Sequence, residues 1–258
     1  MINRTQDITD LPDTEYTILA KMISNIGHNH SKLPETALTA FLAMSGKKYD
    51  RKLMVVGRAL NGWGNEWLPK DVLVEDKVKE IVERMVGLRK DNHDQICWVS
   101  TDWNGSPNNK YKVRTSAFWR VIKKIVERLD LPNIIKPDWP SFLVWSNLYK
   151  ISPGEGGNPS DKIKKLQCDY CRQLLALEVE TYCPEKILFL TGYQWWAKPF
   201  MEGWTQDIQL TLKNEYKYIE AIGASVLPNS GRGKVVVAPH PQGKKETELV
   251  NEVVRAFA

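Results

Sequence analysis

The sequence predicts an α/β fold with three layers, α/β/α, in which helices cover both faces of a central, mainly parallel, four-stranded sheet. Four short apolar runs carry this prediction, at 52–57, 141–147, 186–192 and 234–238. A nearly continuous apolar run is typical of a strand that is buried on both faces. Helical patterns separate most of these runs, and such an alternation favours a parallel sheet between two layers of helices.

Periodic apolar residues and end signals predict the helices that cover this sheet. Pro34 and Gly46 frame the first of them, because proline favours the start of a helix and glycine its end. The stretch 96–100 is predicted to be a further short strand, and 208–227 a β-hairpin. The predicted helices are 34–45, 76–88, 115–129, 161–182 and 246–257.

Nothing in the 258 residues marks a domain boundary, so we expect one domain, residues 1–258, with residues 1–15 as a loose polar arm. The hydrophobic share of 42% is enough to bury a sizeable core. No apolar run approaches the roughly 18 residues of a membrane span, and the first residues lack the pattern of a signal peptide. We therefore expect a cytoplasmic protein, and a monomer.

The four cysteines, Cys97, Cys168, Cys171 and Cys183, are too sparse for a disulfide scaffold. Cys168 and Cys171 fall within a predicted helix, which favours packed thiols over a metal site. The glycine-rich stretch after the first strand has neither dinucleotide-loop nor P-loop spacing. We therefore expect no cofactor, no metal and no iron–sulfur cluster. The net charge of +5 permits an anionic partner without requiring one.

Polar residues and glycine follow the predicted strands at the edge where parallel sheets bind ligands. Gly57 allows a close approach of backbone to a ligand, and Asn147 offers a donor and an acceptor together. His240 lies between two prolines, which restrict its backbone. The nearby Trp63, Trp67 and Trp145 are candidates for stacking on a flat ligand.

Four segments, in order, resemble the motifs of the uracil-DNA glycosylase superfamily. They are the glycine-led 55–61, the asparagine-bearing 145–150, the strand 184–192, and 238–242 with its His-Pro pair. The segment 116–120 also resembles a helix start in some branches of that superfamily. The resemblance runs from about Lys52 to the C-terminus.

This resemblance implies a DNA glycosylase that flips out a uracil-like or modified pyrimidine and hydrolyses its N-glycosidic bond. The product would be an abasic site, as in base-excision DNA repair. His240 would stabilise the charge on the leaving base, and Asn147 would read the base edge. The remaining residues of the base pocket would be Gly57, Arg58, Ala59 and Trp63.

The first motif lacks the acid that the best-studied branch carries, so the residue that handles the attacking water stays open among Asn61, Glu66 and Asp102. DNA contacts are expected from Gln242, Lys244, Lys245, Arg114 and Arg120. The basic stretch 110–128 is either a solvated helix face or a surface that contacts phosphates.

Three other functions remain open at this point. The altered first motif and the ten tryptophans also fit a bulkier target, such as a modified cytosine of phage DNA, which would make the protein a phage-defence enzyme. A non-catalytic nucleic-acid-binding relative of the same fold is a second alternative. An unrelated α/β hydrolase that acts on small nucleotides is the third.

Overall fold

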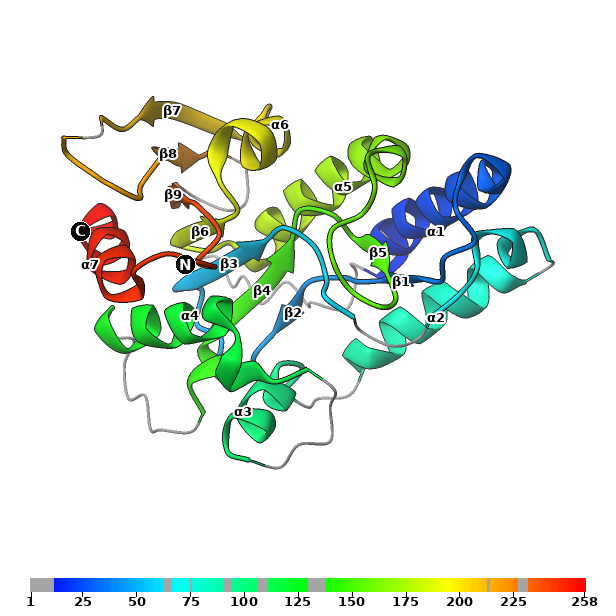
Figure 1. Cartoon of the computed structure of the whole chain (residues 1–258), viewed down its shortest axis with the longest axis horizontal. Helices are drawn as coiled ribbons and strands as arrows, with labels where there is room; N and C mark the ends of the chain where they lie inside the picture. The colour runs from blue at the N-terminus through cyan, green and yellow to red at the C-terminus, as the bar shows by residue number, and fades with distance from the viewer. Residues whose placement is uncertain are drawn as a thin grey trace, which may run out of the picture.

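The structure is a computed structural model, which describes residues 12–62, 66–74, 76–90, 94–105, 111–129, 138–212, 214–226 and 232–258. Among these residues the main sheet has seven strands, in the order β2-β4-β3-β6-β9-β8-β7 (Figure 1). Its strands are β2 (Met44–Ser45), β3 (Leu53–Gly57), β4 (Leu143–Asn147), β6 (Lys186–Leu190), β7 (Thr205–Leu210), β8 (Ala221–Ser225) and β9 (Lys234–Ala238).

The four predicted strands are confirmed as the centre of this sheet. β4, β3, β6 and β9 are neighbours, and each pairs in parallel with the next. The sheet is wider than predicted, because β2 adds to β4, and β8 and β7 add to β9, all in antiparallel pairing. β7 and β8 form the hairpin that the sequence predicts. A separate antiparallel pair joins β1 (Leu38–Ala40) to β5 (Ile151–Pro153).

Helices cover both faces of the sheet, which gives the predicted three layers (Figure 1). Alternate residues of β3 show the division, since Met54 and Val56 face one core and Leu53 and Val55 the other. One face packs α1 (Pro12–His28), α2 (Lys77–Lys90) and α5 (Asp161–Tyr182), and the other packs α3 (Cys97–Trp103), α4 (Ala117–Arg128) and α7 (Glu246–Phe257). The short α6 (Lys198–Met201) follows β6.

The helices predicted at 76–88, 115–129, 161–182 and 246–257 are confirmed as α2, α4, α5 and α7. Local signals set the ends of α5. The Ser160 hydroxyl accepts a hydrogen bond from the backbone N–H of Ile163, which caps the start of the helix. Cys183, in the left-handed region with φ of 44°, ends it.

The helix predicted at 34–45 is wrong, and so is the strand predicted at 96–100. Residues 39–44 are buried on every side, so their apolar spacing reflects an extended segment that pairs with β5 and β4 rather than one face of a helix. The stretch 96–100 contains the start of α3 at Cys97, and Ile96, which precedes the helix, and Val99 within it are both fully buried.

The expected loose arm, 1–15, overlaps a helix that the sequence prediction missed. α1 begins at Pro12, and its residues Leu19, Met22, Ile23 and Ile26 are fully buried at helical spacing. Residues 12–15 are therefore part of this helix, and residues 1–11 lie outside the described residues.

In the described part of the chain, no helix has the length and apolar character needed to span a membrane. All four cysteines are free thiols. Burial raises the pKa of the Cys171 thiol to about 12. Cys171 therefore stays protonated at neutral pH and serves as a packed core residue, as the sequence predicts for a thiol within a helix.

Candidate functional site

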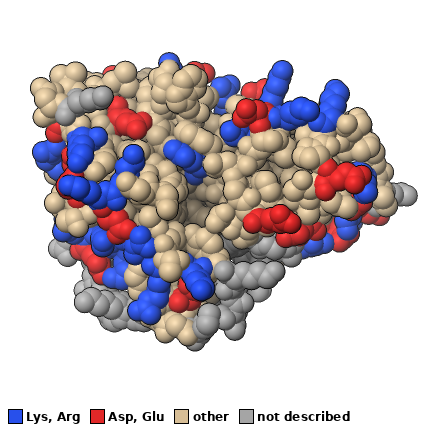
Figure 2. All heavy atoms as spheres, viewed as in Figure 1, with Lys and Arg blue, Asp and Glu red and all other residues tan. Residues whose placement is uncertain are grey.

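The carboxyl ends of the parallel strands bring the predicted polar residues to one edge of the sheet. Gly57 ends β3 and Asn147 ends β4, and the two residues are paired side by side. β4 and β6 lie on opposite sides of β3, so the chain reverses its direction of winding there. Ligands of open α/β sheets bind at such a point. Figure 2 shows a hollowed, mostly uncharged area near the middle of this view of the molecule.

Residue 57 has to be glycine because two side chains lie too close to leave room for a Cβ atom. A Cβ atom at this position would lie 2.4 Å from Oδ1 of Asn147 and 3.3 Å from Cζ of Phe118. Asn147 is only 1% exposed, and among the described residues its Nδ2 has no hydrogen-bond partner. A buried amide donor without a partner costs roughly 1–3 kcal/mol. An acceptor on a bound ligand would remove that cost, which makes Asn147 a candidate binding residue.

His240 is held as a neutral imidazole with a defined tautomer. Its Nδ1 lies 3.2 Å from the backbone N–H of Gln242 and accepts that hydrogen bond, so the ring proton is on Nε2. Burial, with a further effect from the charge of Arg58, lowers the pKa of His240 to about 4. The ring is nearly parallel to that of Phe118, with 14° between the planes and 6.2 Å between the centroids. His240 therefore presents an N–H donor at neutral pH.

The neutral state of His240 makes the stability of the fold depend on pH. Its pKa is about 4 in the folded protein and near 6.5 in an unfolded chain. The unfolded state therefore binds more protons between these values, and stability falls as the pH drops from about 6.5 to about 4. Between these pH values the free energy of unfolding of His240→Asn should therefore fall less than that of the wild-type protein, by on the order of 2 kcal/mol.

Urea unfolding at neutral and acidic pH measures this difference, with His28→Asn, a replacement of an exposed histidine on α1, as the matched control. An unchanged pH dependence in His240→Asn would contradict the assignment of a neutral imidazole at position 240.

Arg58 links the ends of β3 and β6. Its Nε donates to the carbonyl oxygen of Thr191 at 2.8 Å, and its guanidinium lies 4.5 Å from the ring centroid of Trp196. Burial lowers the pKa of Arg58. Lys164 approaches the same Trp196 ring, with its Nζ 4.9 Å from the centroid. Trp196 lies within the segment 192–196, which the sequence places after a strand at the ligand-binding edge, but the sequence prediction gives it no role in the site.

A π-helix, Tyr193–Ala197, carries that tryptophan. π-Helical turns are rare and are often found at functional sites. Gly192, with φ of 88°, makes the turn from β6 into this element. Trp195, which precedes Trp196 in this π-helix, is 85% exposed, so the edge also carries a large accessible aromatic side chain.

Two of the residues proposed for the attacking water contact the glycine loop after β5. Oδ1 of Asn61 accepts a hydrogen bond from the backbone N–H of Gly157 at 3.0 Å. The carboxyl group of Glu66 lies over Gly154, where a Cβ atom would be 2.5 Å from its Cδ. Asn61 therefore holds this loop by a hydrogen bond, whereas the exposed Glu66 lies against it with no hydrogen bond among the described residues. Ala59 packs against the core of the α1 and α5 face, and Trp63 lies outside the described residues.

The third proposed residue, Asp102, is buried in α3 and accepts a hydrogen bond from the backbone N–H of Val113 at 2.6 Å. This contact ties α3 to the segment that leads into α4. Trp67 and Trp145, expected to stack on a ligand, are 3% and 6% exposed and belong to the two cores. Neither ring presents a free face, because the surrounding core packs against it.

The basic stretch before and within α4 divides into two parts. Arg120 donates from Nε and Nη2 to Glu246 of α7, at 2.9 and 2.6 Å, and Lys124 also donates to Glu246, at 2.7 Å. This part holds two helices together, an outcome that neither sequence interpretation considered. Figure 2 shows the mixed charges over α4 and α7. Arg114 is exposed ahead of the helix.

The turn after His240 presents exposed polar and basic side chains. Gln242, Lys244 and Lys245 are all exposed. Lys245 forms an ion pair of 3.1 Å with Glu248, which is partly exposed, so this pair holds the lysine only weakly. These exposed side chains follow the carboxyl end of β9.

A buried charged network lies directly beneath Asn147. Lys150 and Glu178 have fully buried side chains, and Nζ of Lys150 lies 2.7 Å from Oε1 and from Oε2 of Glu178. Ser146 accepts from Lys150 and donates to Glu178, at 2.7 and 2.6 Å, and the backbone N–H of Ala43 also donates to Glu178. The network fixes the end of β4 to α5. The asparagine motif of the sequence contains Lys150 but does not reveal its partner.

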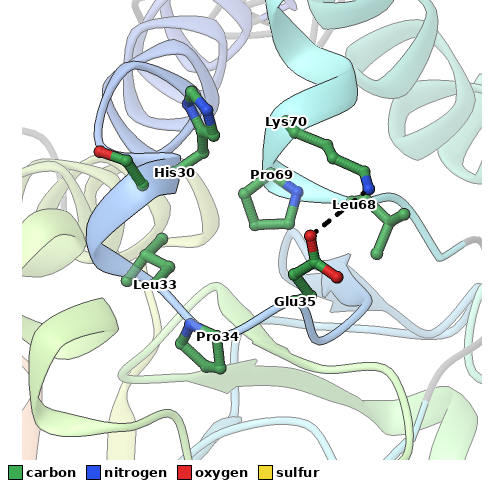
Figure 3. Close-up of a pocket in the computed structure, with 8 residues that line it drawn as sticks. His30, Leu33, Pro34, Glu35, Leu68, Pro69 and Lys70 are labelled. Atoms are coloured by element: carbon green, nitrogen blue, oxygen red, sulfur yellow. Dashed lines mark ion pairs between the residues drawn. The ribbon is translucent and has the colours of Figure 1, made fainter.

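A separate pocket of about 180 Å³ lies between the end of α1 and the short helix Pro69–Leu73 (Figure 3). His30, Leu33 and Pro34 line one side of it, and an ion pair between Glu35 and Lys70, 3.6 Å long, crosses its mouth. It contains none of the predicted site residues. The described residues hold no group of three or more histidines, cysteines and acids placed to bind a metal ion.

Comparison with known proteins adds no family to this geometry. A scan against protein-family models gives no match, and a search of curated proteins gives none either.

Proposed function

We propose that the chain is a DNA glycosylase of the uracil-DNA glycosylase superfamily, which flips out a pyrimidine-derived base and hydrolyses its N-glycosidic bond. One observation carries the proposal, namely that a neutral His240 donor and the buried amide of Asn147 occur at the same strand edge. Nδ2 of that amide has no hydrogen-bond partner in the part of the chain that the structure describes. Phe118 lies between them, since its ring is 3.3 Å from the position that a Cβ atom of residue 57 would take beside Asn147, and it stacks on His240. The parallel order of the motif-bearing strands supports a fold of the same kind.

The chemistry follows from these groups. Nδ2 of Asn147 donates to a carbonyl oxygen on the edge of the flipped base. The bond between C1′ of the sugar and the base nitrogen then breaks, and its electron pair leaves with the base through an oxocarbenium-like transition state. Nε2–H of His240 donates to the base oxygen on which negative charge develops. A pre-placed donor of this kind is worth about 10²–10³ in rate.

The exposed Gln242, Lys244, Lys245 and Arg114 supply contacts to the DNA backbone. Arg120 is left out of this group because its guanidinium already binds Glu246. Binding would therefore weaken as salt rises. The exposed Trp195 and the hollow at this edge are also compatible with a bulky modified cytosine, the target of a phage-defence enzyme.

The experiment is a cleavage assay on oligonucleotides that carry uracil, hypoxanthine or a modified cytosine, with alkali used to reveal abasic sites. We expect abasic product from at least one pyrimidine substrate. His240→Ala is expected to lower its rate by about 10²–10³-fold. His28→Ala, which removes an exposed histidine of α1, is the matched control and should retain the wild-type rate.

The other results identify the alternatives. Salt-sensitive binding of DNA without abasic product would favour the non-catalytic nucleic-acid-binding relative. Hydrolysis of free nucleotides with no action on oligonucleotides would favour the small-nucleotide hydrolase.

A further inference from the structure

A carboxylate that the motifs do not contain lies at the strand edge. Of the three residues expected to handle the water, Asn61 and Asp102 already accept hydrogen bonds from the backbone N–H groups of Gly157 and Val113. The third, Glu66, is exposed and lies against Gly154 of the glycine loop. Glu220, by contrast, lies beside the ends of β6 and β9. The sequence gives no local sign of this, because Glu220 belongs to the hairpin and to none of the four motifs.

The topology of the hairpin explains the position of Glu220. β8 runs antiparallel to β9, so the start of β8 adjoins the carboxyl end of β9, with Ala221 paired to Val237. The backbone N–H of Glu220 donates to the carbonyl oxygen of Val237 at 2.8 Å. An antiparallel strand added to a parallel sheet therefore returns an acid to the edge where ligands bind.

The side chain of Glu220 is fixed at one oxygen. Oε2 accepts a hydrogen bond from the backbone N–H of Tyr193 at 2.6 Å. Among the described residues, Oε1 accepts no hydrogen bond, and the carboxylate forms no direct ion pair, although its charge interacts with that of Arg58. One oxygen is thus anchored, and the other can accept a proton.

The space beside this carboxylate is open because residue 192 is glycine. A Cβ atom at Gly192 would lie 3.7 Å from Oε2 of Glu220 and 3.9 Å from Nη2 of Arg58. Arg58 in turn is close enough for its charge to act on His240. Arg58 therefore lies near both Glu220 and His240, beside the end of β6.

We infer that Glu220 is the catalytic carboxylate that activates the attacking water, an inference that rests on the glycosylase function proposed above. The water oxygen forms a bond to C1′ as the bond from C1′ to the base nitrogen breaks. The electron pair of that bond leaves with the base, whose charge is met by Nε2–H of His240. The water proton passes to Oε1 of Glu220 and then to the released base, so atoms and charges balance without another reactant.

The test is single-turnover cleavage of the substrate that the wild-type protein cuts. We expect Glu220→Gln to slow cleavage by about 10²–10⁴-fold, the usual contribution of a general base. The dissociation constant for the same oligonucleotide should change less than about twofold, because Glu220 contacts water and not DNA. Added formate should partly restore cleavage by Glu220→Ala, since it supplies a carboxylate to the space left by truncation. Glu202→Gln, at an exposed acid that follows α6, is the matched control.

The failures of the two proposals are distinguishable. If Glu220→Gln cuts within about threefold of the wild-type rate, or if its DNA affinity falls as far as its rate, the role of Glu220 is overturned and the glycosylase remains. If Glu66→Gln, rather than Glu220→Gln, abolishes cleavage, the carboxylate that activates water is Glu66. If the wild-type protein makes no abasic product, both proposals fall.

Discussion

Replacement of Lys150 by methionine is expected to lower the free energy of unfolding by about 3–5 kcal/mol. The side chains of Lys150 and Glu178 are both 0% exposed, and the lysine donates to both carboxylate oxygens of Glu178. Methionine fills a similar volume but leaves the carboxylate buried without its cation. The cost therefore comes from the uncompensated charge of Glu178 and not from a cavity.

Urea unfolding measures this loss, and two comparisons make the result specific. Lys48→Met removes a lysine whose ion pair with Asp138 is about half exposed on both sides, and it should cost less than about 1 kcal/mol. The double variant Lys150→Met with Glu178→Leu should recover much of the lost stability, because it removes both charges. A Lys150→Met protein as stable as Lys48→Met would contradict the buried pair.

Replacement of Gly57 by alanine is expected to damage the site more than the fold. The added Cβ would lie 2.4 Å from Oδ1 of Asn147, far inside contact distance, so the amide has to move. The strain should cost about 1–3 kcal/mol of stability. A displacement of about 1 Å in a positioned group costs about 10²-fold in rate, so we expect a loss of cleavage of that order.

Gly87→Ala is the matched control for this prediction, because a Cβ atom at Gly87 meets nothing within 4 Å. Gly87 lies in the exposed face of α2, where alanine should stabilise the helix by about 0.5–1 kcal/mol. Thermal unfolding and the cleavage assay are measured on both variants. Wild-type cleavage by Gly57→Ala would show that Asn147 does not need its present position against β3.

The sequence correctly predicted those strands and helices whose structure is determined mainly by their own residues. The strands at 53–57, 186–190 and 234–238 are short apolar runs, α5 carries its own cap at Ser160, and α7 buries its apolar residues at helical spacing. The segment 38–45 failed because its apolar spacing matches a helix while its actual partners, β5 and β4, lie about a hundred residues away. Pairing with distant strands outweighed local propensity there.

In the candidate site, too, some features follow from local sequence and others from contacts between distant residues. The sequence alone determined the parallel core of the sheet and the placement of Gly57, Asn147 and His240 at strand ends, because strand direction fixes the edge at which such residues occur. Only the tertiary structure decided the tautomer of His240, the use of Arg120 in a helix contact and the partnership of Lys150 with Glu178. It also brought Glu220 to the edge through the antiparallel β8. These features depend on burial and on contacts between residues far apart in the chain, which local sequence patterns do not encode.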